Sequence, residues 1–234
     1  MRGIIKREFR AYFQSPLGYV FIAAFIFMAS YYFFTYNLLG NTTNFTSLFS
    51  MLFSVVLFLC PILTMRLMSE DKKNKTDQLL LTSPIPLGDI VTGKYLAALS
   101  VYGIACFSVV IDALIASAYG KVEWATVIGN IAGLLFLGMA LISVCLFLSS
   151  LTESQVIAAV SGFAVSLFLL LIGSLADVVS SPVAKRVIHY VAFSNRYEPF
   201  TYGIFDLTSV VFFLSFTLLF LVMSTVTLEK RRWS

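Results

Sequence analysis

Long apolar runs separated by short polar connections dominate this chain of 234 residues. A helix needs about 20 largely apolar residues to cross the hydrocarbon core of a bilayer. Six runs have that character: 17–39, 48–65, 95–119, 125–150, 156–176 and 207–228. The pattern predicts an all-α polytopic membrane protein, with residues 1–234 forming one domain of six transmembrane helices and both termini on the same side.

The basic residues indicate which side that is. Twelve of the 16 Lys and Arg residues lie before the first run, between the second and third runs, or after the last run. Because cytoplasmic segments of membrane proteins are enriched in Lys and Arg, we expect both termini in the cytoplasm. The net charge of +4 is then explained by lipid headgroups, so we expect membrane lipid and no nucleic acid as a partner.

Two shorter amphipathic segments accompany the six runs. Residues 2–14 carry aromatic and aliphatic side chains on one helical face and basic side chains on another, which predicts an elbow helix lying in the inner membrane interface. Ser15 followed by Pro16 is a helix-start signal, because the first turn has no use for the N–H that proline lacks. Residues 182–193 show a similar two-faced pattern, which predicts an external amphipathic or re-entrant helix.

Composition supports the membrane assignment. Hydrophobic residues make up 59% of the chain and charged residues only 12%, and the mean hydropathy is +0.91, well outside the range of soluble domains. Cys60, Cys106 and Cys145 each lie inside an apolar run, where thiols behave as small hydrophobic groups. We interpret them as packing residues and expect neither a metal nor a cofactor in this chain.

Residues 88–95, GDIVTGKY, imitate a phosphate-binding loop. Tyr95 stands where that motif needs a Ser or Thr to ligate magnesium, and no apolar strand precedes Gly88. We interpret Lys94 instead as a lysine at the mouth of a transmembrane helix that extends its ammonium group into water. The sequence therefore predicts no ATP hydrolysis by this chain and no catalytic residues.

Asp112 is the one carboxylate well inside an apolar run. An ionisable residue at membrane depth is a candidate for function, here as a proton or cation site. The alternative is a protonated or hydrogen-bonded side chain that holds neighbouring helices. No basic residue lies in the interior of any run, so we favour the structural alternative.

The polar stretch between the second and third runs has helical features of its own. The second helix is expected to continue through Arg66 to about Lys72, and Thr76 can then cap a short helix that contains Leu79 and Leu80. Ser83-Pro84 ends it. The residues alone leave open whether these leucines contact lipid or a soluble partner.

Several motifs, in order along the whole chain, resemble those of ABC exporter permeases of the second type, the ABC-2 family. The segments that match are KREFRAYFQSPLGYV, RLMSEDKKNKTDQLLLTSPIPLGDIVTGKYL, LSSLTESQVIAA and NRYEPFTYGIFDLTSVVFFLSFTLLFL. They are most similar to the gliding-motility and copper-enzyme-maturation branch of that family. Two positions depart from the pattern: Lys75 stands where Gly is usual, and Gln78 where Glu is common.

The resemblance implies a transport function. The stretch between the second and third spans would carry a coupling helix that contacts a separate ABC ATPase, present in two copies and holding ATP and magnesium. A second permease subunit, either a copy of this chain or a paralogue, would complete the pathway in a bacterial cytoplasmic membrane. The positions that match the coupling region are Arg66, Glu70, Asp71, Thr76, Asp77, Gln78, Leu79, Leu80, Pro84 and Lys94.

Two other functions remain as alternatives. An ion-coupled secondary transporter would use Asp112, but such proteins show broken helices in repeated halves, and no paired Gly/Pro interruptions are present here. An intramembrane hydrolase would need a nucleophile with a base or a group of metal ligands at one depth. One isolated Asp and His189, the single histidine, do not provide that.

Overall fold

The computed structural model describes residues 2–76, 86–178, 188 and 190–233 of the chain, and every regular element in these ranges is helical. The elements are α1 (Arg2–Gln14), α2 (Pro16–Tyr32), the π-helix η1 (Phe33–Leu38), α3 (Thr46–Thr64), α4 (Ser69–Lys73), α6 (Leu87–Tyr119), α7 (Trp124–Leu151), α8 (Gln155–Val178), α10 (Phe193–Thr201) and α11 (Leu207–Trp233). The predicted all-α fold is confirmed.

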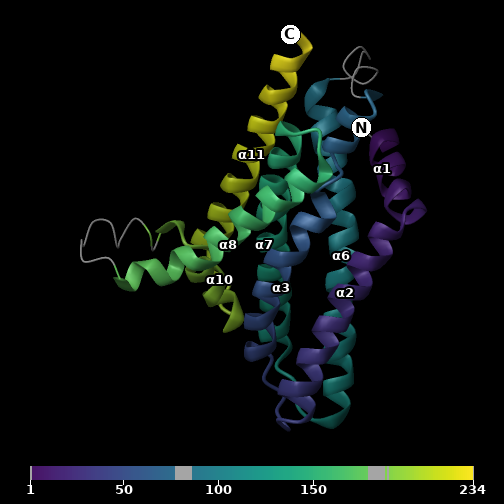
Figure 1. Ribbon diagram of the computed structural model, residues 1–234. Helices are drawn as coiled ribbons and strands as arrows, with labels where there is room; N and C mark the ends of the chain where they lie inside the picture. Colours follow the sequence, from purple (N-terminus) through teal and green to yellow (C-terminus); the bar gives the residue numbers. More distant parts are fainter. Residues whose placement is uncertain (1, 77–85, 179–187, 189, 234) are drawn as a thin grey trace.

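Six helices are long and apolar enough to cross a membrane in the described part of the chain. They cover Pro16–Leu38, Thr46–Lys73, Leu87–Tyr119, Trp124–Leu151, Gln155–Gly173 and Leu207–Arg232, close to the six predicted spans. The two chain ends lie at the same end of the bundle, as does the connection between α3 and α6, while α8 leaves the bundle at an angle (Figure 1). We call this end, which holds α1, α4 and both termini, the charged end.

The second and third spans differ from prediction at the charged end. α3 stops at Thr64, and a turn at residues 65–68 separates it from α4, where a continuous helix to about Lys72 was expected. α6 begins at Leu87 rather than near residue 95. Its first turns bury Leu87, Ile90 and Val91, so packing against the protein extends the helix beyond its apolar span. Residues 88–95 are therefore helical, which is not the loop geometry of a phosphate-binding motif.

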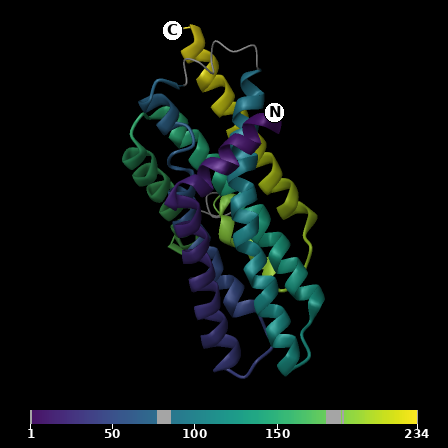
Figure 2. The ribbon, with the colours of Figure 1, turned by 90° about the vertical axis from the view of Figure 1, so that its right-hand side faces the viewer.

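The elbow helix α1 has the predicted bounds, but its apolar face contacts the protein itself. It crosses α6 obliquely (Figure 2), with Ile4 seated on Gly93, where a Cβ atom would lie 2.9 Å from Ile4 Cγ2. Tyr12 is 3% exposed and donates a hydrogen bond from its hydroxyl to the Leu63 carbonyl oxygen at 2.8 Å. The exposed face carries the polar side chains Lys6, Arg7, Arg10 and Gln14.

A short, partly buried helix precedes the last span. The predicted amphipathic segment 182–193 lies largely outside the described residues, and the buried helix is α10, which follows it. With nine residues α10 is about 13 Å long, too short to cross a bilayer. Tyr197 donates to the Phe49 carbonyl oxygen at 3.1 Å, and Phe200 is fully buried against Gly133 of α7. α10 is therefore held between α3 and α7.

The centre of the bundle is organised around Tyr102 of α6. Its side chain is fully buried, and its hydroxyl donates to the Leu134 carbonyl oxygen on α7 at 2.7 Å. The ring fits there because α7 has Gly138 beside it, where a Cβ atom would lie 2.1 Å from Tyr102 Cε1. The close approach of α6 and α7 therefore depends on a glycine.

We expect Gly138→Ala to lower the free energy of unfolding by about 1–3 kcal/mol, the usual effect of overpacking a filled core. The matched control is Gly103→Ala on α6, where a Cβ atom has no neighbour within 4 Å. That variant should be neutral or stabilise the helix by about 0.5–1 kcal/mol. Thermal unfolding of the purified proteins measures both, and equal shifts for the two variants would contradict the Tyr102 contact.

Candidate functional site

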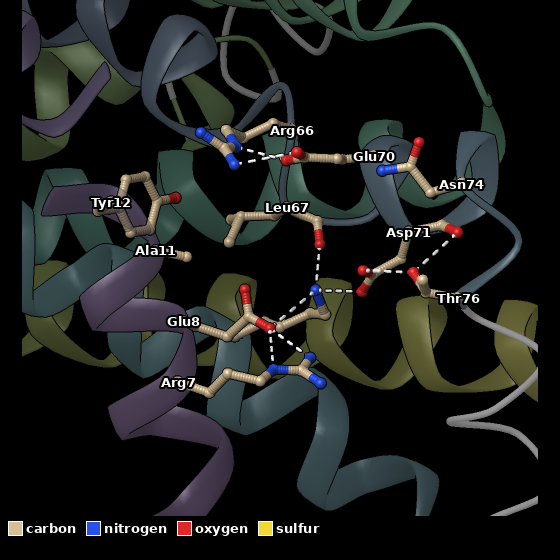
Figure 3. Close-up of a pocket in the computed structure, with 11 residues that line it drawn as sticks. Arg7, Glu8, Ala11, Tyr12, Arg66, Leu67, Glu70, Asp71, Asn74 and Thr76 are labelled. Carbon is tan, nitrogen blue, oxygen red and sulfur yellow. Dashed lines mark hydrogen bonds and ion pairs between the residues drawn. The ribbon is translucent and has the colours of Figure 1, made fainter. Parts of the chain in front are cut away.

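A buried ion cluster joins three separate elements at the charged end. Lys94 of α6 is 2% exposed. Its Nζ lies 2.6 Å from Asp71 Oδ2, 3.4 Å from Glu8 Oε1, and 2.5 Å from the Leu67 carbonyl oxygen, to which it donates. Figure 3 shows Glu8, Leu67 and Asp71 facing one another across the cluster. The ammonium group therefore has one hydrogen-bond acceptor and two carboxylate counter-ions.

This geometry corrects the interpretation of Lys94. A lysine at the mouth of a helix that reached water would be exposed, whereas this side chain is enclosed by α1, the 65–68 turn and α4. The early start of α6 is the physical reason, because it adds two turns of helix that α1 and α4 cover. Lys94 is therefore a buried charge with its own counter-ions rather than an interfacial lysine.

Local sequence favours the conformation of α4. Glu70 and Asp71 lie in its first turn and Lys72 and Lys73 in its last, which matches the helix dipole at both ends. Arg66, in the preceding turn, donates to both carboxylate oxygens of Glu70 at 2.5 and 3.0 Å. This bidentate pair fixes the turn against the helix that follows it.

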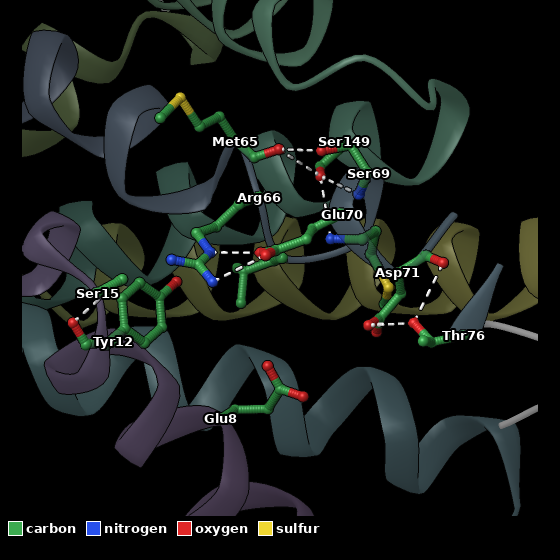
Figure 4. Close-up of polar contacts among 12 residues, drawn as sticks. Glu8, Tyr12, Ser15, Met65, Arg66, Ser69, Glu70, Asp71, Thr76 and Ser149 are labelled. Atoms are coloured by element: carbon green, nitrogen blue, oxygen red, sulfur yellow. Dashed lines mark hydrogen bonds and ion pairs between the residues drawn. The ribbon is translucent and has the colours of Figure 1, made fainter. Parts of the chain in front are cut away.

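Asp71 connects the cluster to the next part of the chain. Its Oδ1 accepts a hydrogen bond from the Thr76 hydroxyl at 3.0 Å (Figure 4), while Oδ2 lies 2.6 Å from Lys94 Nζ. Thr76 is helical and is the last described residue before residue 86, so the short helix predicted after it lies outside the described residues. One carboxylate therefore links Lys94 to the start of the predicted coupling helix.

Glu8 is a functional candidate that sequence analysis missed. It accepts hydrogen bonds from Arg7 at 3.2 and 2.6 Å and also faces Lys94. The hydrogen bond to Glu8 raises the pKa of Arg7 above its usual value. The available signal was that Glu8 is the only acidic residue in an otherwise basic elbow helix.

A second set of contacts fastens the same turn to α7. Ser149 Oγ accepts the backbone N–H groups of Met68 and Ser69, each at 3.2 Å, and donates to the Met65 carbonyl oxygen at 3.1 Å (Figure 4). Lys72, which is 7% exposed, donates from its ammonium group to the Ser150 carbonyl oxygen. Carbonyl groups in the last turn of a helix lack intrahelical partners, so this lysine caps α7.

A cavity of about 300 Å³ lies beside the cluster, lined by residues of α1, of α6 and of residues 65–76 (Figure 3). Tyr12 forms part of its wall. Burial raises the pKa of the Tyr12 phenol, so its hydroxyl keeps the proton that it donates to Leu63. Its lining holds equal numbers of basic and acidic side chains, so their formal charges cancel.

The family assignment rests on one comparison. The family model described as an ABC-2 family transporter protein matches residues 3–230. The chain belongs to the ABC-2 transporter family. A search of curated proteins gave no match. As an ABC-2 permease, the chain is a multi-pass membrane subunit for transport, and permeases of this family act with an ATPase partner.

The structure brings together five of the ten positions that match the ABC-2 coupling region: Arg66, Glu70, Asp71, Thr76 and Lys94. The other five, Asp77, Gln78, Leu79, Leu80 and Pro84, lie outside the described residues. The sequence placed the described five on one stretch of chain. It did not show that α1 and α7 enclose them.

Asp112 lies apart from this site, about five helical turns beyond Lys94 on α6. It is 6% exposed, and its Oδ2 has no hydrogen-bond partner within the described ranges. An ionised carboxylate in such a position is costly, which favours the protonated form or a cation nearby. Within the same ranges, no three His, Cys, Asp or Glu residues are grouped as a metal site.

The backbone explains one departure from the family pattern. Lys75 has φ = 57°, in the left-handed region that glycine adopts without strain. This is the position where the ABC-2 permeases that the chain resembles usually have Gly. The turn between α4 and Thr76 therefore has a backbone conformation that favours glycine, but the residue in it is a lysine.

We expect Lys75→Gly to raise the free energy of unfolding by up to about 1 kcal/mol, because it relieves a left-handed conformation that disfavours L-residues by roughly 1–2 kcal/mol. Lys73→Gly is the matched control: the residue is also exposed and basic but lies in α4, where glycine weakens the helix. Thermal unfolding should shift upward for Lys75→Gly and downward for Lys73→Gly. Shifts of the same sign would show that the backbone at Lys75 is not strained.

For Asp112 we expect the substitution by Asn to retain most transport, since Asn keeps the shape and the hydrogen-bonding capacity but cannot titrate. Complementation of a strain that lacks the gene measures transport, and the amount of assembled complex is the control. Loss of transport with normal assembly and normal ATPase activity would show that Asp112 binds a proton, a cation or the cargo.

Proposed function

We propose that this ABC-2 protein is the membrane-spanning permease subunit of an ATP-driven exporter. It pairs with a second permease subunit, either itself or a paralogue, and two copies of a separate ATPase bind at the charged end. The observation that carries the proposal is that side chains tie residues 65–76 to α6 and α7, and that Lys94 of α6 also pairs with Glu8 of α1. A segment built in this way transmits a movement, whereas a loose connection absorbs it.

The distribution of charge supports the orientation. Most Lys and Arg residues lie at the charged end, which carries both termini and the connection between α3 and α6. The positive-inside rule places this end in the cytoplasm, where ATP and a soluble ATPase are found. The protein then lies in a bacterial cytoplasmic membrane with its α6–α7 connection outside.

The chemistry of ATP belongs to the partner. In this chain the residues that imitate a phosphate-binding loop are the first turns of α6, so ATP and magnesium are held by the ATPase. Binding and hydrolysis of ATP move the docked segment, and the contacts at Lys94 and Ser149 pass that movement to the spans. The cargo pathway changes its access in response.

One observation favours a second candidate, an ion-coupled secondary transporter. The Oδ2 atom of Asp112 is buried without a hydrogen-bond partner in the described part of the chain, as in a carboxylate that exchanges a proton. An ion-coupled transporter would account for the buried Asp112. It would not account for the contacts that fix residues 65–76 at the charged end, because transport driven by an ion gradient does not need a docking site for an ATPase. Transport that is driven by a pH or sodium gradient in the absence of an ATPase would favour it.

Docking is tested at the leucines of the predicted coupling helix. A buried leucine contributes roughly 1.5–3 kcal/mol, and about 1.4 kcal/mol corresponds to a factor of ten in affinity. We therefore expect Leu79→Asp with Leu80→Asp to weaken ATPase binding by about a hundredfold or more, while the protein still inserts in the membrane. Co-purification of the ATPase with the tagged permease measures the effect.

The control is Leu79→Met with Leu80→Met, which keeps apolar volume and should retain the ATPase. If the aspartate variant inserted normally and still retained a fully stimulated ATPase, this stretch would not be the docking element. The leucines would then contact lipid.

A further inference from the structure

We infer that Lys94 joins the elbow helix α1 and the docking segment into one mechanical unit, so that the ATPase moves α2 through α1. Lys94 and Glu8 are then positioning residues for coupling, although neither touches ATP or cargo. The inference rests on the proposed function, because it assumes that an ATPase docks after Thr76.

The first step is that Lys94 holds three elements in one geometry. Glu8 on α1 and Asp71 on α4 form ion pairs with its ammonium group, and the Leu67 carbonyl oxygen in the turn between α3 and α4 accepts a hydrogen bond from it. The side chain is almost fully enclosed. Moving α1 or α4 away removes one of the two carboxylates that neutralise this buried charge, which is unfavourable. The three elements therefore move together.

The second step leads from the ATPase to Lys94. Thr76 begins the stretch proposed to dock, and its hydroxyl donates to Asp71 Oδ1 at 3.0 Å. The other oxygen of the same carboxylate lies 2.6 Å from Lys94. Because a carboxylate is planar and rigid, a displacement of Thr76 reaches Lys94 through one side chain.

The third step leads from α1 to α2. Only Ser15 separates the two helices, and Gly18 of α2 is packed against Tyr12 of α1, where a Cβ atom would lie 2.7 Å from the Tyr12 carbonyl oxygen. The elbow is therefore too tight to bend freely. The first span is covered mainly on one side, and Tyr19, Phe27 and Tyr31 of α2 and Phe34 of η1 are more than half exposed on the other. A helix held on one side only is the span that an elbow can displace.

The test must separate transmission from folding. Lys94→Met alone leaves Asp71 without its counter-ion and should destabilise the protein. The pair Lys94→Met with Asp71→Asn removes both charges but keeps an acceptor for Thr76. We expect this neutral pair to recover the thermal stability of the native protein, because no buried charge is left without its counter-ion, and to retain the ATPase, because the docking contact is assigned to Leu79 and Leu80.

Coupling is read at the opposite end of the bundle. The connections α2–α3, α6–α7 and α10–α11 meet there around a cavity of about 390 Å³, and Tyr202 on its wall is 60% exposed. A Tyr202→Cys label reacts with a membrane-impermeant maleimide in the purified permease–ATPase complex, with and without ATP and magnesium. The three native cysteines are buried, and a chain without the added cysteine gives the background.

In the otherwise native complex we expect ATP to change the labelling rate several-fold. In the neutral pair the rate should be the same with and without ATP, although the ATPase remains bound. A neutral pair whose labelling still responds to ATP as in the native protein would overturn the inference, since the ion cluster would then only stabilise the fold. If the native chain retains no ATPase, the proposed function fails as well.

Glu8→Gln provides a second, milder variant that keeps an acceptor for Lys94 and a folded protein. We expect it to reduce the ATP-dependent change in labelling by at least half. The matched control is Glu153→Gln, which removes an exposed acid paired with Arg231 at 3.1 Å at the same end of the bundle but outside the cluster. Equal behaviour of the two variants would exclude a specific role for α1 in coupling.

Discussion

The requirement that a buried ammonium group be neutralised shapes the charged end of this protein. Lys94 lies in the first turns of α6 and is enclosed, so its charge must be neutralised by groups from neighbouring elements. Glu8 and Asp71 supply the negative charge, and the turn after α3 supplies a carbonyl oxygen. The position of α1 across α6 and the break between α3 and α4 both serve this arrangement.

The two ends of the bundle are built for different tasks. At the charged end, ionic and hydrogen-bonding contacts fix residues 65–76 to α6 and α7 and, through Lys94, to α1. At the opposite end, exposed aromatic residues such as Tyr119, Trp124 and Tyr202 provide the side chains that are typical of a membrane interface. Between the two ends, α10 connects α3 and α7 by packing against both of them. This asymmetry fits a permease that receives work at one end and changes access at the other.

Membership of the ABC-2 family is consistent with the scarcity of charged side chains in the apolar runs. An ABC-2 permease leaves ATP chemistry to its partner. In the proposed function, its own chain supplies a pathway for the cargo and a rigid connection between the ATPase and the spans, and no catalytic centre is needed. Asp112 is the exception, because its carboxylate is buried without a described partner for Oδ2. The stiff connection is built from a small number of charged side chains, each of which bridges elements distant in sequence.

The sequence by itself determined the six spans and the elbow helix, because the thickness of a bilayer sets the length of an apolar run and the helical period sets the two faces of α1. It also placed Arg66, Glu70, Asp71 and Thr76 on one stretch. Tertiary structure decided the rest. Whether Lys94 reaches water or is buried depends on Glu8 and Leu67, which are far from it along the chain, and on the packing of Ile4 against Gly93. Hydropathy describes each residue alone, whereas the pairing of a buried charge depends on the groups that other helices place beside it.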